Sequence, residues 1–230
     1  MGYRNTAGRF RTHRNAPRNA VLAAAALLVT VLSGCGDATE GDAAPSSFPA
    51  RAWPNYTTAD GALSFEYPPS WQVTELAALA NDPAGGVSLQ VADGSGRVLA
   101  RLDTGIIADL SCTTAAEPGA YAEYEAVPMP ELGSAQGTEQ RFVYRSLAPA
   151  GERAAQATYA VVSGRQQAGQ CGLFDFFTLT ASSGGRFAGE YLPGADTGDA
   201  RAYLEGAERY RESDEYRDIK RMLTSLRNAH

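Results

Sequence analysis

Apolar and polar residues alternate with a period of two along much of the chain, which is the pattern of strands with one buried face. In segment 62–67, Leu63, Phe65 and Tyr67 share one face, and polar residues separate them. The same alternation, with turn-forming residues between the segments, predicts further strands. These are 71–73, 87–91, 98–102, 121–126, 140–146, 156–162, 173–180 and 186–191.

Segment 173–179 (LFDFFTL) differs from the other predicted strands because both of its faces carry large apolar side chains. A strand of this kind is expected in the middle of a sheet that is covered on both sides. We therefore predict a central strand here, with its cover supplied by helices near the C-terminus.

Two amphipathic helices are predicted in that region. The first spans 199–211, and the second follows Ser213, which can cap it. The apolar stripe of the first consists of Tyr203, Leu204, Ala207 and Tyr210. The apolar stripe of the second consists of Tyr216, Ile219, Met222, Leu223 and Leu226. The predicted fold class is α+β, an antiparallel β-sheet with helices packed on it and the C-terminal helix closing the domain.

The N-terminus has the three parts of a bacterial lipoprotein signal. Residues 1–20 contain five arginines and no acidic residue, and 21–32 is apolar but too short to span a bilayer as a helix. The sequence Leu-Ser-Gly-Cys then ends at Cys35, whose thiol would accept a diacylglyceryl group, with cleavage between Gly34 and Cys35. A plain secretory signal, or a membrane helix with a chance cysteine, is the alternative.

This signal divides the sequence into three predicted parts. Residues 1–34 are the signal peptide, and 35–50 are a lipid-anchored flexible tether of small and polar residues. Residues 51–230 have the length of a single domain. We expect this domain on the extracytoplasmic face of the cell membrane, held there by diacylglycerol on Cys35.

The charge of the exported part limits its partners. The whole chain has 20 Lys and Arg against 26 Asp and Glu. Five arginines lie in the signal, so 15 cationic residues remain against 26 acidic ones, a net charge of −11. Such a domain should be repelled by nucleic acid and by anionic lipid headgroups, and we expect neither as a partner.

The exported part contains two further cysteines, Cys112 and Cys171. An even number in an exported protein predicts a disulfide between them. On the loop-entropy model, closing a loop of this length stabilises the fold by about 4 kcal/mol. A redox-active pair is the alternative, although the chain has no Cys-x-x-Cys motif.

Two short stretches resemble a known family. They are Tyr67-Pro68-Pro69-Ser70-Trp71, after an aromatic strand, and Met222-Leu223-Thr224-Ser225-Leu226, at the end of the last helix. They are similar to the Pro-x-x-Trp turn and the terminal Ser-Leu pair of PsbP-like domains, in particular the LpqN-type lipoproteins of actinobacteria. The resemblance implies an α/β/α sandwich. It also implies an accessory or assembly role, because PsbP-like domains have no agreed catalytic site.

The exported domain has no internal histidine, the residue that histidine-dependent catalysis requires. The two histidines are His13, in the signal, and His230, the last residue. Ser-His-Asp and Cys-His catalysis, and the usual zinc or copper sites, therefore lack an internal histidine. We expect no enzyme activity, no metal and no cofactor.

Carboxylate chemistry is the remaining catalytic alternative. Asp103-Thr104-Gly105 matches the aspartic-protease triplet, but that chemistry needs two such loops, and the chain has one. We interpret the triplet as the turn that ends strand 98–102. A glycosidase pair is also conceivable, although no spacing selects two of the many acidic residues.

Asp175 is a lone acidic residue inside the most apolar predicted strand, so its charge must be paired or exposed at an edge. It is interpreted either as a salt bridge, with Arg141 or Arg145 as its partner, or, with Phe176, as part of a ligand pocket. Two functions stay open. One is a binding surface for an envelope protein or cell-wall component, and the other is a carrier of a small apolar ligand between sheet and helices.

Overall fold

The computed structural model describes residues 52–77, 85–107, 120–148, 154–164, 173–194 and 199–229. All of them belong to one compact unit, Phe48–His230. The other unit, Met1–Ser47, consists of residues outside the described ranges.

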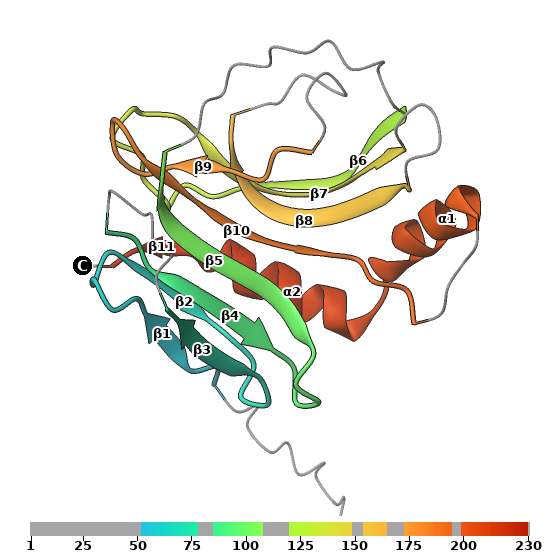
Figure 1. Cartoon of the computed structure of the whole chain (residues 1–230), viewed down its shortest axis with the longest axis horizontal. Helices are drawn as coiled ribbons and strands as arrows, with labels where there is room; N and C mark the ends of the chain where they lie inside the picture. Colours follow the sequence, from blue (N-terminus) through green and yellow to red (C-terminus); the bar gives the residue numbers. More distant parts are fainter. Residues whose placement is uncertain are drawn as a thin grey trace, which may run out of the picture. The chain divides into compact units, whose positions relative to one another are not determined.

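The described residues form eleven strands and two helices (Figure 1). The strands are β1 (Asn55–Thr57), β2 (Leu63–Glu66), β3 (Gln72–Leu76), β4 (Ser88–Ala92), β5 (Val98–Ile106), β6 (Ala120–Pro128), β7 (Gln140–Ala148), β8 (Gln156–Ser163), β9 (Phe177–Thr178), β10 (Gly184–Glu190) and β11 (Arg227–Asn228). The helices are α1 (Ala200–Tyr210) and α2 (Asp214–Thr224). The fold is therefore a domain rich in β-sheet with two helices late in the chain.

The strands form two antiparallel sheets. A small sheet has the order β1-β2-β11, and the main sheet has the order β3-β4-β5-β10-β8-β7-β6, with β9 paired to β10 beside that path. Strand β10 comes late in the sequence but lies between β5 and β8. It thereby joins the early strands β3–β5 to the middle strands β6–β8 in one sheet.

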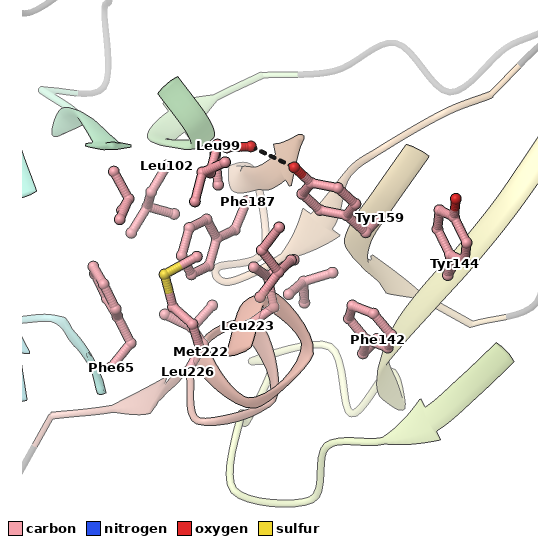
Figure 2. Packing of buried hydrophobic residues seen from close by; sticks show 14 of the residues in the cluster. Phe65, Leu99, Leu102, Phe142, Tyr144, Tyr159, Phe187, Met222, Leu223 and Leu226 are labelled. Atoms are coloured by element: carbon pink, nitrogen blue, oxygen red, sulfur yellow. Dashed lines mark hydrogen bonds between the residues drawn. The ribbon is translucent and has the colours of Figure 1, made fainter. Parts of the chain in front are cut away.

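The hydrophobic core lies between one face of the main sheet, the small sheet and helix α2. Figure 2 shows Met222, Leu223 and Leu226 near Phe65 of β2 and Phe187 of β10. All five side chains are buried. The apolar stripe predicted for the last helix is thus confirmed, and it joins the two sheets through a shared core.

Both ends of α2 are held as its sequence requires. The Ser213 hydroxyl oxygen accepts the N–H of Tyr216 at 3.1 Å, which confirms the predicted N-cap. At the other end, the Ser225 hydroxyl oxygen accepts the N–H of Glu66 at 2.8 Å. The Ser-Leu pair at the end of this helix therefore has a structural role, because Ser225 links the helix to β2 and Leu226 is buried.

The Pro-x-x-Trp segment forms a turn between β2 and β3. The N–H of Trp71 donates to the carbonyl oxygen of Pro68 at 3.0 Å. The indole of Trp71 is half-buried and packs against the main core. This turn reverses the chain from the small sheet into the first strand of the main sheet.

The prediction of a central strand over 173–180 is wrong. Only Phe177 and Thr178 are in a strand, and they pair with β10 alone. The centre of the main sheet is β10, which alternation over 186–191 predicts as a strand but not as the central one, because three of its residues are glycine. A Cβ on one of them, Gly189, would overlap the carbonyl oxygen of Leu99 on β5 and the ring of Tyr159 on β8. The absence of a side chain at Gly189 therefore allows β10 to pack closely between β5 and β8.

Candidate functional site

The main sheet has a core face and a second face on the opposite side. Directly paired residues share a face, and Leu89, Leu102 and Phe187 are paired across β4, β5 and β10. All three are fully buried in the core. The residues between them along each strand point to the second face.

Five residues on this second face form a surface that we call the polar sheet face. Thr74 pairs with Gln90, and Gln90 pairs with Arg101. Beside this row, Asp103 of β5 pairs with Arg186 of β10. Thr74 and Arg101 are exposed, and the other three are partly exposed. This part of the sheet therefore presents hydrogen-bonding and charged groups to its surroundings.

The second face becomes apolar further along the same row. Arg101 pairs with Ala188, Ala188 with Ala160, and Ala160 with Val143. These three apolar residues are buried and, with Val162, form a small core cluster of their own. The second face is thus divided, with a polar part on β3, β4, β5 and the Arg186 end of β10, and a buried apolar part that runs from Ala188 of β10 to β8 and β7.

A buried ion pair lies where the segment before β9 meets this apolar part. The Arg145 side chain is 0% exposed, and its Nη2 donates to Asp175 Oδ1 and to the Phe174 carbonyl oxygen, both at 2.8 Å. The Thr158 hydroxyl donates to the same Asp175 oxygen at 3.2 Å. Arg186 Nη2 lies 3.6 Å from Asp175 Oδ2. The salt-bridge interpretation of Asp175 is therefore the arrangement found, and it includes Arg186, which the sequence did not suggest.

The other candidate partner, Arg141, is engaged elsewhere. Its Nη2 lies 2.9 Å from Glu123 Oε2 on the neighbouring strand β6, and its Nε donates to the Gly164 carbonyl oxygen at 2.9 Å. Arg141 and Arg145 both lie on β7, four residues apart, so they share a face. Of these two arginines, only Arg145 reaches Asp175.

Phe176, the second residue proposed for a ligand pocket, is a packing residue in this structure. The residue is 9% exposed, and its ring lies 5.7 Å from the ring of Phe174, measured between centroids. Its carbonyl oxygen accepts the N–H of Ser163 at 3.1 Å. Asp175 and Phe176 thus belong to a segment that is held against β7 and β8, and a ligand there remains a proposal.

Asp103-Thr104-Gly105 is not a turn, and that prediction is wrong. All three residues lie inside β5, which runs on to Ile106. Asp103 accepts a hydrogen bond from the Ser88 hydroxyl at 2.6 Å, and the buried Thr104 hydroxyl oxygen accepts the N–H of Val87 at 2.9 Å. Polar partners on the neighbouring chain segment allow these residues to continue the strand.

Tyrosine side chains fill the space between the main sheet and the helices. Five of these tyrosines donate a hydrogen bond from the hydroxyl group. Three donate to carbonyl oxygens, Tyr144 to Ala207, Tyr159 to Leu99 and Tyr203 to Tyr191. Two donate to carboxylates, Tyr210 to Glu215 and Tyr216 to Glu125. Burial is the main cause that raises the pKa of Tyr203 to about 12 and raises the pKa of the other four tyrosines as well. These hydroxyls are neutral structural donors.

The same interface leaves no water-sized space beside its central side chains. Tyr144, Ile219 and Met222 are all 0% exposed. An apolar ligand between sheet and helices would need to displace this packing. The interface therefore gives no support to a carrier site at these residues.

One open hollow, of about 350 Å³, lies at the connection between β6 and β7. Its lining consists of Pro128, Met129, Pro130, Leu132, Gly133, Ser134, Gly137, Thr138, Glu139 and Gln140. Glu139 is the one titratable group of this lining, so the hollow offers no pair of groups for acid–base chemistry.

Several predicted sites lie outside the described residues. They are the cleavage site at Gly34, the lipidation site at Cys35 and the disulfide of Cys112 and Cys171. Within the described ranges, no helix is long and apolar enough to cross a membrane. In the same ranges, His, Cys, Asp and Glu side chains nowhere gather into a group that could hold a metal ion.

Arg101 and Arg186 were not singled out from the sequence, although a signal for Arg101 was present. Strict alternation in the predicted strand 98–102 places Arg101 opposite in direction to the buried Leu102. For Arg186 the sequence contains no comparable signal. Gly185 and Phe187 flank it, and the pattern does not give the position of this strand in the sheet.

The described residues thus form an antiparallel β-sheet domain that carries two helices and presents the polar sheet face. Comparisons with family models, with curated proteins and with solved structures gave no match to the chain.

Proposed function

We propose that this protein is a lipid-anchored, extracytoplasmic accessory protein of the PsbP-like type, without enzyme activity. It would present the polar sheet face to an envelope protein or a cell-wall component. The observation that carries this proposal is the division of the main sheet into a core face and a partly exposed polar face. The two stretches that resemble PsbP-like domains support the α/β/α sandwich as the finer description of the fold.

The start of the described domain is packed on the core-face side of the main sheet. Trp53, close to the start of the described domain, stacks on the Arg221 guanidinium with 3.9 Å between the ring centroid and Cζ. Arg221 belongs to α2, and its Nη2 lies 3.4 Å from Glu66 Oε2 on β2. Both elements pack on the core face of the main sheet. Trp53 is thus held among elements on the core face, and the polar sheet face lies on the other side of the main sheet.

A carrier of a small apolar ligand is the alternative function. The packed tyrosine layer makes the space between sheet and helices a poor place for such a ligand. The carrier proposal would then depend on the segment around Asp175 and Phe176, which the Arg145 ion pair holds in place.

Site-specific photo-cross-linking in the cells that make the protein tests the proposal. A benzophenone amino acid at Thr74, on the polar sheet face, should give a discrete adduct with another molecule. The same amino acid at Glu205, exposed on α1, is the matched control and should give none. Adducts from Glu205 alone, or from neither position, would refute the proposed surface.

A further inference from the structure

The acidic and cationic groups at the polar sheet face differ in their exposure to solvent and in the partners that they already have. Asp103 accepts the Ser88 hydroxyl at 2.6 Å and is partly buried. The nearby Asp175 is 7% exposed and is already paired with Arg145. Both carboxylates are therefore partly or fully withdrawn from solvent and have hydrogen-bond donors of their own.

The two arginines are more available. Arg101 is exposed and forms no ion pair with any described residue. Arg186 is 41% exposed, and its ion-pair contact within the described residues is the 3.6 Å approach to Asp175. Because Arg145 holds that carboxylate more closely, the charge of Arg186 is only partly compensated.

The register places these two arginines close together. Arg101 pairs with Ala188 and Asp103 pairs with Arg186, so Arg101 and Arg186 are diagonal neighbours on adjacent strands. Diagonal neighbours on one face lie about 7–8 Å apart, within reach of long side chains. Two guanidinium groups at this spacing can bind one carboxylate from both sides.

We propose that Arg101 and Arg186 bind a carboxylate group on a segment of a partner protein. This inference rests on the proposed function and names the chemistry of the partner at the same surface. A partner segment with an isolated acidic side chain fits better than a polyanion, because the net charge of −11 on the exported part repels a highly charged polymer. Gln90 continues the row beyond Arg101 and supplies hydrogen-bonding groups to the same segment, and Thr74 lies at the end of that row.

The test uses the full-length protein with the photo-cross-linker at Thr74 and compares the yield of adduct in its native cells. Changing both arginines (Arg101→Gln with Arg186→Gln) should lower the yield roughly tenfold or more, as expected when two charge-assisted contacts are lost. The single change Arg101→Gln should lower it too, and it keeps the test valid if the double variant is unstable. Arg209→Gln, which removes an exposed arginine from α1, is the matched control and should leave the yield unchanged.

The outcomes separate this inference from the proposed function. Two results together support the carboxylate site. The adduct is lost in the Arg101 and Arg186 variants, and mass spectrometry finds an Asp, a Glu or a terminal carboxyl in the cross-linked segment. An adduct that persists in those variants, or a cross-linked segment without a carboxylate, overturns it while the polar sheet face stands as the binding surface. No adduct in the protein with both arginines intact refutes both.

Discussion

The Arg145 guanidinium is fully buried on β7 and lies 2.8 Å from the carboxylate of Asp175, in the segment that precedes β9. Taking both charges out of water is costly, and the pair is tolerated because further groups satisfy it. Thr158 donates to the carboxylate, and the Phe174 carbonyl oxygen accepts from the guanidinium. The pair therefore fixes where the 173–176 segment lies on the sheet, at the border between its apolar part and the polar sheet face.

Breaking this pair from one side should destabilise the fold strongly. Asp175→Ala leaves the Arg145 charge buried without its carboxylate, and we expect a loss of about 3–5 kcal/mol in the free energy of unfolding. Urea denaturation of the mature domain measures it. Glu205→Ala, which removes the exposed partner of Arg201, is the control and should cost less than about 1 kcal/mol.

Replacing both charges together distinguishes a buried-charge penalty from lost packing. The double variant Arg145→Met with Asp175→Leu should recover most of the stability lost in Asp175→Ala, because no uncompensated charge remains. If the double variant is less stable than Asp175→Ala, the pair contributes attraction that apolar side chains do not replace.

A single methyl group should disrupt the centre of the main sheet. In Gly189→Ala, the new Cβ would overlap the Leu99 carbonyl oxygen, which also accepts the Tyr159 hydroxyl. Backbone must therefore shift on two strands, and we expect a loss of about 1–3 kcal/mol or more. Gly194→Ala meets nothing within 4 Å and should be close to neutral. Thermal unfolding of the two variants, side by side, checks the difference; equal stabilities would mean that β10 is not packed this closely.

The sequence predicts the local elements better than their arrangement. Segments such as β2 and β4 show clear alternation of apolar and polar residues, and the caps and stripe of α2 are local features that fix its ends and its buried side. The central position of β10 depends on contacts between distant strands, and its glycines carry no apolar signal. Segment 173–179 shows the opposite error, because Phe176 and Phe177 are buried although most of the segment is irregular rather than a central strand.

The polar sheet face could be predicted only in part for the same reason. Alternation places Arg101 on the side away from Leu102, but the neighbour relation of Arg101 and Arg186 requires β10 to lie beside β5. The sequence predicts that Asp175, a lone charge in an apolar segment, needs a partner. The choice of Arg145 over Arg141 depended on the path of the segment before β9, which no local pattern records.

Acid should weaken one turn of the protein in a defined pH range. The pKa of Asp93 is lowered to about 2, mainly because the Ser95 hydroxyl donates a hydrogen bond to its carboxylate. The N–H groups of Ser95 and Arg97 and the Arg97 guanidinium lower this pKa further, and burial opposes the shift. A carboxyl whose pKa is lower in the folded state stabilises the fold above its unfolded value of 3.8, and this contribution is lost as the pH falls towards 2. Arg97 also pairs with Glu215 at the start of α2, so the turn supports the packing of that helix.

The comparison of Asp93→Asn with the unaltered protein isolates this effect from the other carboxyl groups. The difference in their thermal midpoints should be largest near pH 5 and should shrink between pH 4 and pH 2, because protonation of Asp93 then has the same effect as the substitution. Circular dichroism at a series of pH values measures it. A difference that stays constant down to pH 2 would show that Asp93 does not contribute through its charge.

The lipid anchor can be tested separately from the domain. If Cys35 carries the diacylglyceryl group, Cys35→Ala should move the protein from the membrane fraction to the soluble fraction. The described core begins near Trp53, which stacks on Arg221 of α2, so its folding should not depend on a residue in the predicted tether. Thermal unfolding of the purified variant should therefore match that of a domain that starts at residue 51. Retention of the variant in membranes after carbonate washing would show that something other than the Cys35 lipid holds the protein there.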